Sequence, residues 1–135
     1  MSEEIMQAGG MGELLFSILL SIISFSMGRA AKNNKAIKEM MAIRNLVFVI
    51  MTEDGKIGRR LIFKNGKFSS DKVLTDYNMA LVWKDPSTAF KTMAFGGETG
   101  LQDAMNNWNL RLAGDPGFLN LFAVLLLVSL GKMKR

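Results

Sequence analysis

Alternating apolar and polar residues along much of the chain predict β-strands with one buried face and one solvent-exposed face. The segments with this pattern, or with a short apolar run of β-strand composition, are residues 46–51, 57–64, 67–70, 79–84 and 108–113. Asn65–Gly66 joins two of them and is a strong signal for a two-residue hairpin, because both positions tolerate a positive φ. In the last segment Trp108, Leu110 and Leu112 form the apolar phase, which we expect to face a core.

Two Asp-Pro pairs predict helix starts, because Asp can cap a helix N-terminus and Pro fits its first turn. The first pair, Asp85–Pro86, begins a helix that we expect to end at Gly96–Gly97, and a short helical segment follows at residues 101–106. The second pair, Asp115–Pro116, begins a helix over residues 118–130 that is apolar on nearly every side, with a glycine C-cap and basic residues after it. Such a helix must be enclosed by protein or lipid, but it is shorter than the roughly 20 residues that cross a bilayer.

A second apolar segment, residues 14–27, predicts another helix near the N-terminus. Small residues recur on one face of it and would let another helix approach closely; they are Ser17, Ser21, Ser24 and Gly28. A cleaved secretory signal is disfavoured, because Glu3 and Glu4 precede the apolar run and no small-residue cleavage site follows it. Basic residues come next, as expected for a helix that is attracted to the anionic cytoplasmic face of a membrane.

Membrane association through this segment is our preferred interpretation. The residues expected to contact the membrane are Leu14, Leu15, Phe16, Ile18, Leu19, Leu20, Ile22, Ile23, Phe25, Arg29, Lys32, Lys35 and Lys38. This interpretation places the protein in the cytoplasm, at the inner face of the membrane. The alternative is that residues 14–27 form a core or dimerisation helix and that the lysines after it are its solvated continuation.

The composition narrows the possible chemistry. The 135 residues include neither Cys nor His, which removes disulfides, thiolate nucleophiles, cysteine zinc sites and the commonest general base. No pair of carboxylates has an acid–base context, and the glycine-rich segment 96–100 lacks the Lys-Ser/Thr ending of a phosphate-binding loop. We therefore expect a non-enzymatic protein without metal or cofactor. A hydrophobic content of 49% and a net charge of +5 favour lipid and anionic surfaces as partners, whereas nucleic acid is disfavoured because the aromatic residues lie on the apolar phase.

Three stretches together resemble the sterol carrier protein type-two (SCP2-like) domain family. These stretches are VFVIMTEDGKIGRRLIFKNGKFS, MALVWKDPSTAFKTMAFGG and LRLAGDPGFLNLFAVLL, and the resemblance covers about residues 46–134. It rests on the hairpin with its Asn-Gly turn, the Asp-Pro-capped helix that ends in glycine, and the strand that ends in Gly-Asp before the final apolar helix. The resemblance implies a five-stranded sheet whose helices enclose a hydrophobic tunnel for sterols, acyl chains or other lipids. Bacterial members of the family include accessory proteins of isoprenoid-quinone biosynthesis.

Pattern and resemblance together predict an α+β fold, with a largely antiparallel five-stranded sheet, helices on one face, and an apolar helix before it. Residues 1–45 would form an N-terminal apolar helix and a basic linker that associate with a membrane or mediate oligomerisation, and residues 46–135 would form the SCP2-like lipid-binding domain. The predicted function is non-catalytic binding of a lipid, acyl chain or quinone-like isoprenoid in a tunnel between the sheet and the C-terminal helix. The candidate ligand-binding residues are Phe48, Ile50, Leu61, Phe63, Leu81, Trp83, Phe90, Met93, Trp108, Leu110, Phe118, Leu121, Phe122 and Leu125.

A second hypothesis makes the chain a small membrane-attached accessory subunit. Its apolar helices would then pack against partner subunits or further copies of the chain through residues 14–28, and side chains would fill the tunnel. The 11 methionines are compatible with both hypotheses, because methionine suits an adaptable pocket and also fills ordinary cores.

Overall fold

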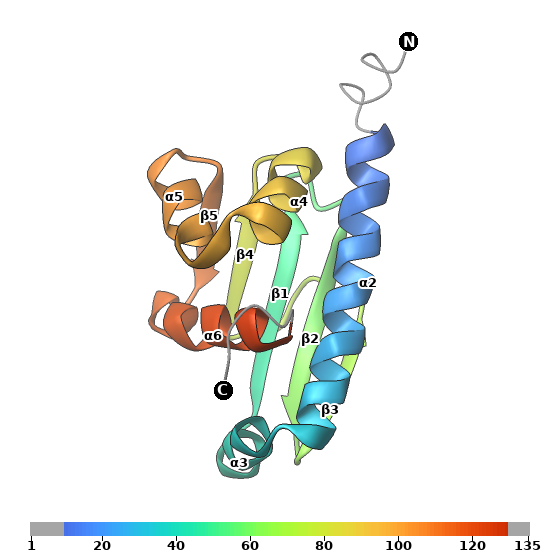
Figure 1. The fold of residues 1–135 in the computed structure, drawn as a ribbon, viewed down its shortest axis with the longest axis vertical. Coiled ribbons are helices and arrows are strands. Elements are labelled where there is room, and N and C mark those ends of the chain that lie inside the picture. Colours follow the sequence, from blue (N-terminus) through green and yellow to red (C-terminus); the bar gives the residue numbers. More distant parts are fainter. Residues whose placement is uncertain (1–9, 130–135) are drawn as a thin grey trace.

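Five strands form one mixed sheet in the order β3-β2-β1-β4-β5 (Figure 1). They are β1 (Leu46–Thr52), β2 (Gly58–Lys64), β3 (Lys67–Asp71), β4 (Met79–Trp83) and β5 (Leu110–Gly114). Neighbouring strands pair antiparallel except β1 and β4, which run parallel. The structure, a computed structural model, describes residues 10–129 of the chain. The predicted five-stranded, largely antiparallel sheet is confirmed.

Helices cover one face of this sheet (Figure 1). They are α2 (Gly10–Asn33), α3 (Lys35–Ile43), α4 (Pro86–Phe95), α5 (Gly100–Asn106) and α6 (Leu119–Ser129), with 3-10 turns at Gly97–Thr99 and Pro116–Phe118. The helix α2 is longer than the predicted segment 14–27 and runs beside β2 and β3, whereas α6 crosses in front of the sheet. The predicted glycine C-cap and basic residues after α6 lie outside the described residues.

Local sequence signals account for the main turns and helix starts. Asn65 and Gly66 both adopt positive φ, 55° and 74°, as the predicted hairpin turn requires. The Asp85 carboxylate accepts a hydrogen bond from the Thr88 amide (2.7 Å) at the start of α4, and Asp115 caps the 3-10 turn that leads into α6 in the same way. These caps satisfy backbone amides that have no partner within the helix.

The last strand begins later than predicted, because residues 108 and 109 complete the end of α5. Trp108 adopts the left-handed conformation (φ 62°) and its side chain is 89% exposed, so it neither belongs to β5 nor faces the core. The Trp108 amide donates to the Met105 carbonyl (3.2 Å), and the Asn109 amide donates to the Ala104 carbonyl (2.8 Å). Because the chain is still completing α5 in these bonds, regular pairing begins only at Leu110 in β5.

A cluster of aromatic rings fills the space between the sheet and α6. Phe48 of β1 stacks on Phe122 of α6, with ring centroids 4.3 Å apart and an interplanar angle of 5°. Phe63 and Phe118 meet Phe48 edge to face, at 6.4 and 6.2 Å. On the opposite face of the sheet, a smaller cluster is covered by the β3–β4 connection, through Leu74 and residues beside it. The main core therefore lies on the helix-covered face.

Replacing Phe122 with Ala should lower the free energy of unfolding by about 3–5 kcal/mol, because the change removes a fully buried ring from the stack and leaves a cavity. The same change at Phe25, which is 67% exposed, should alter it by only about 0.5 kcal/mol. Urea denaturation followed by circular dichroism measures both variants. Equal losses at the two positions would contradict the packing of α6 on β1.

Candidate functional site

An apolar groove lies between α6 and the junction of α2 with α3. Its volume is about 560 Å³, within the range of about 300–1,000 Å³ that is usual for sites that bind small molecules. Its lining residues are Asn33, Asn34, Lys35, Ala36, Ile37, Met40, Leu121, Val124, Leu125 and Val128. One wall is the apolar side of α3, and the other is the part of α6 that the sheet does not cover. An apolar molecule in the groove would therefore contact hydrophobic side chains of both helices.

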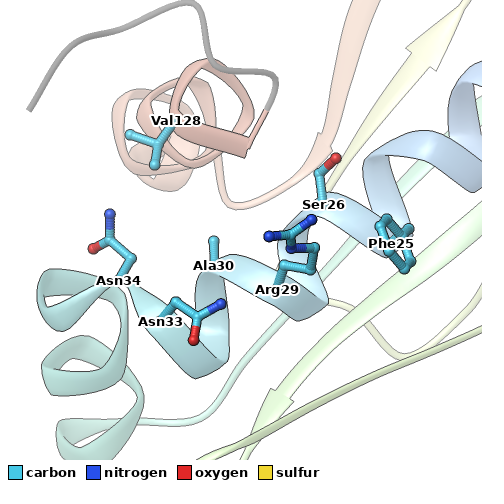
Figure 2. A pocket seen from close by; sticks show the side chains of 7 residues that line it. All are labelled: Phe25, Ser26, Arg29, Ala30, Asn33, Asn34 and Val128. Carbon is cyan, nitrogen blue, oxygen red and sulfur yellow. The ribbon is translucent and has the colours of Figure 1, made fainter.

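A more polar cleft adjoins this groove and shares three lining residues with it, Asn33, Asn34 and Val128. Figure 2 shows Val128 of α6 across the opening from Ala30 of α2 and from Asn34. The other lining residues are Phe25, Ser26 and Arg29. Groove and cleft together form a continuous surface, which we call the α6 groove, with an apolar end at α3 and a polar end near Arg29.

The polar end carries groups that are free to bind a ligand. Arg29 is exposed and forms no ion pair with any residue in the described part of the chain. The Asn34 side-chain oxygen accepts a hydrogen bond from the Ile37 amide (3.1 Å) and caps α3, which leaves its amide nitrogen as a donor. A cation and an amide donor at one end of an apolar groove suit a molecule with an oily chain and an oxygen-rich head.

The predicted ligand-binding residues are brought together, with one exception. All except Trp108 belong to, or pack against, the hydrophobic cluster between the sheet and the helices. Only Leu121 and Leu125 among them also line the α6 groove. The remaining predicted ligand-binding residues within the cluster pack in the core. In the absence of a ligand, side chains therefore occupy the space beneath α6 where the tunnel was predicted.

Sequence reasoning missed the α3 wall of the groove, because α3 itself was not predicted. Its basic residues suggested a linker, and only Ile37, Met40 and Met41 carry the apolar spacing of a helix. That spacing, together with Asn34 as an N-cap, is the signal that could have found it. The groove itself joins segments far apart in sequence and has no local signature.

The helix α2 is apolar on two faces that have different environments. Four of the residues predicted to contact a membrane are instead buried in the core, namely Phe16, Leu19, Leu20 and Ile23. The opposite face is exposed, and we call it the α2 stripe; it consists of Met11, Leu14, Ile18, Ile22 and Phe25. The predicted basic residues Arg29, Lys32, Lys35 and Lys38 are also exposed. By length and composition α2 could cross a membrane, yet 33% of its apolar window is buried within this fold.

The small residues of α2 face the sheet edge. A methyl group at Gly28 would lie 3.5 Å from the Phe68 ring of β3, and the Ser21 hydroxyl accepts a hydrogen bond from Arg59 of β2 (3.3 Å). Close approach of another helix occurs instead at Gly12, where a methyl group would overlap the Ser87 side chain of α4. The expected helix partner for this side of α2 is therefore replaced by β2 and β3.

Basic residues line two clefts along the seam between α2 and the sheet edge. One cleft contains Lys56, Arg59 and Lys72, and the other contains Arg29, Lys32 and Lys67. We call these two clefts the cationic seam. The second cleft shares Phe25 and Arg29 with the α6 groove, so the seam and the groove meet at the Phe25 end of the α2 stripe.

Carboxylates near the sheet are already paired with arginines. The Arg60 guanidinium binds Asp71 through two hydrogen bonds (3.0 and 2.8 Å) and lowers the pKa of that carboxyl. Arg111 binds Glu53 in the same bidentate manner (2.7 and 2.9 Å) and lowers its pKa. In the described residues, no group of three or more Asp or Glu side chains is arranged to hold a metal ion.

Comparisons with known proteins agree with the observed fold. No protein-family model and no curated protein matches the chain. A solved structure described as a "UbiJ-SCP2 Ubiquinone synthesis protein" is similar over 87% of this chain and 96% of that chain, with a TM-score of 0.59 and 13% sequence identity. The chain therefore has an SCP2-like fold. The match is longer than residues 46–134 could supply, so it also includes part of the N-terminal helical region.

The two faces of α2 can be tested with one pair of substitutions at adjacent positions. Ile23→Glu should destabilise the protein by several kcal/mol or prevent folding, because it places a carboxylate in the core. Ile22→Glu, on the exposed stripe, should leave the free energy of unfolding within about 1 kcal/mol of the parent. Thermal and urea unfolding measure both. The reverse order would mean that α2 presents its other face to the sheet.

Proposed function

We propose that the protein binds, without catalysis, a hydrophobic molecule that carries a polar head group. The observation that carries this proposal is the α6 groove, which is apolar between α3 and α6 and polar near Arg29. The SCP2-like fold supports it, since the similar solved structure is described as a ubiquinone synthesis protein. A quinone-like isoprenoid, a fatty acyl chain and a lipid all have the required combination of an oily chain and an oxygen-rich head.

The oily part of the ligand would lie against Leu121, Val124 and Val128 on one wall and Ile37 and Met40 on the other. A longer chain would have to pass beneath α6, where Phe48 and Phe122 are now stacked. The side chains of α6 that face the sheet make apolar contacts, and in the 3-10 turn before α6 the Phe118 ring centroid lies 5.1 Å from the Arg44 guanidinium. Apolar contacts are non-directional, so the apolar side chains of α6 can exchange side-chain partners for ligand partners.

A larger side chain in the α6 groove should weaken ligand binding. Val124→Trp should weaken binding of the fluorescent fatty acid cis-parinaric acid about tenfold, which matches the 1–3 kcal/mol typical of overpacking. Val73→Trp is the matched control, because Val73 is a similarly exposed valine away from the groove. Fluorescence titration measures both variants, and mass spectrometry of solvent extracts identifies any co-purified lipid. Absence of uptake by the parent protein, together with empty extracts, would overturn the proposal.

The same proposal places the protein at an anionic membrane surface, with the α2 stripe lying on the bilayer. Exposed apolar side chains beside basic residues are typical of helices that lie in the membrane interface. Each basic residue near an anionic surface adds about 1 kcal/mol of attraction. If α2 instead crossed the bilayer, Phe16 and Ile23 would leave the core, and the apolar residues of the sheet that α2 now covers would be exposed to water. In the surface arrangement, the α6 groove opens beside the membrane from which a ligand would come.

Membrane binding should depend on the α2 stripe and on salt. Ile18→Ser with Ile22→Ser should abolish flotation with vesicles of phosphatidylcholine and phosphatidylglycerol, and high salt should weaken flotation of the parent because it screens exposed charges. Val73→Ser with Phe95→Ser is the control, since these apolar residues are comparably exposed and do not belong to α2. If the parent does not float, and the stripe variant instead lowers its mass in native mass spectrometry, the stripe is an assembly surface and the accessory-subunit hypothesis is favoured.

A further inference from the structure

The cleft in the middle of α2 differs from the α6 groove in size and chemistry. It lies between α2 and the β1–β2 turn and has a volume of about 220 Å³, below the range of about 300–1,000 Å³ that is usual for whole organic ligands. Its lining residues are Ser17, Leu20, Ser21, Gly55, Lys56, Ile57, Gly58, Arg59, Lys72 and Leu74. The polar side chains among them are hydroxyls and cations only. The cleft therefore suits a small anionic group.

The nearby carboxylates are engaged with other partners. Asp54 accepts hydrogen bonds from the Thr52 hydroxyl (2.7 Å) and from the Lys56 amide (3.0 Å). Asp71, next to Lys72 in sequence, is bound by the guanidinium of Arg60. Within the described part of the chain, Lys56, Arg59 and Lys72 form no ion pair. The cleft is left with a surplus of positive charge.

Arg59 is the most constrained of these cations. It belongs to β2, points to the helix-covered side, and donates from Nη2 to the Ser21 hydroxyl (3.3 Å). Its Nε atom is buried and has no hydrogen-bond partner among the described residues. Leaving a buried charged donor without an acceptor is costly, and an oxyanion that binds Nε and Nη2 as a fork would remove that cost. The backbone amides of Gly55, Lys56 and Ile57 already donate within the turn, so recognition would depend on side chains.

We propose that this cleft is a phosphate-binding site, with Arg59 as the fork that binds two oxygens and with Ser17, Ser21, Lys56 and Lys72 around it. A phosphomonoester fits because several cations and hydroxyls can satisfy its two charges and its oxygens together. Leu20 and Leu74 form apolar walls that reduce solvent access and strengthen these contacts. The site is separate from the α6 groove, so it does not depend on the hydrophobic ligand proposed above.

The phosphate group could come from a soluble molecule or from a lipid headgroup. Ser17 and Ser21 directly adjoin Ile18 and Ile22 of the α2 stripe, so a headgroup would be within reach if the stripe rests on a membrane. Both sources present the same chemistry to Arg59, and experiment can separate them.

Isothermal titration calorimetry of the full-length protein with inorganic phosphate, at low ionic strength, tests the soluble source. Arg59→Gln and Lys72→Gln should each weaken binding, Arg59→Gln by about tenfold or more because it removes a charged bidentate contact. Arg59→Lys should fall between Arg59→Gln and the parent, since it keeps the charge and loses the fork. Lys84→Gln removes one exposed charge outside the cleft and should leave binding unchanged. Lys72 lies at the exposed rim, so its variant should remain folded even if an Arg59 variant does not.

Flotation tests the lipid source, with vesicles that contain phosphatidic acid compared with vesicles of equal surface potential that contain oleate. A preference for phosphatidic acid that Lys72→Gln or Arg59→Gln abolishes, and Lys84→Gln retains, would support a headgroup site even if free phosphate binds weakly. The proposal is overturned if neither form of phosphate binds with dependence on Arg59 and Lys72. It is also overturned if Lys84→Gln reduces binding as much as they do, because the attraction would then be a general effect of net charge.

Discussion

The stacking of Phe48 on Phe122 joins the central strand of the sheet to α6, and the arrangement of the helical layer depends on this contact. An apolar helix such as α6 cannot remain in water, and a sheet covers only one of its sides. Phe122 and Leu125 face the core, while Val124 stays exposed beside the groove. The α6 groove thus arises from the mismatch between a helix that is apolar all round and a sheet that covers one side of it.

The helix α2 is also apolar on more than one side, but one of its apolar sides is buried and another is exposed. Its buried face extends the core along the sheet edge, and its small residues allow β2 and β3 to lie close. The stripe that remains exposed is too apolar to be an ordinary solvated face, and a contiguous exposed apolar patch commonly marks an interaction surface. Because one helix supplies the core face, the stripe and the walls of both the groove and the cationic seam, any partner of α2 would be held close to the α6 groove.

The basic residues of the sheet differ from those along the seam with α2 in whether they are paired with carboxylates. On the sheet, Arg60 and Arg111 are neutralised by the carboxylates they bind. Along the seam with α2, Arg59, Lys67 and Lys72 have no such partner among the described residues. Positive charge that is not paired with a carboxylate therefore lies beside the α2 stripe, where it can act on an anionic surface or ligand.

The strands, the hairpin at Asn65–Gly66 and the Asp-capped helices could be predicted from the sequence, because they rest on local periodicity and turn chemistry. The SCP2-like fold class came from the resemblance of three stretches to that family, and the structural match confirms it. The alternating pattern extended β5 too far, to Trp108, since alternation cannot reveal that helix-ending hydrogen bonds take precedence there. The buried face of α2 could not be predicted in this way, because a helix that is apolar all round carries no amphipathic signal. The α6 groove and the cationic cleft could not be predicted either, because their walls come from segments far apart in sequence and meet only when the helices pack on the sheet.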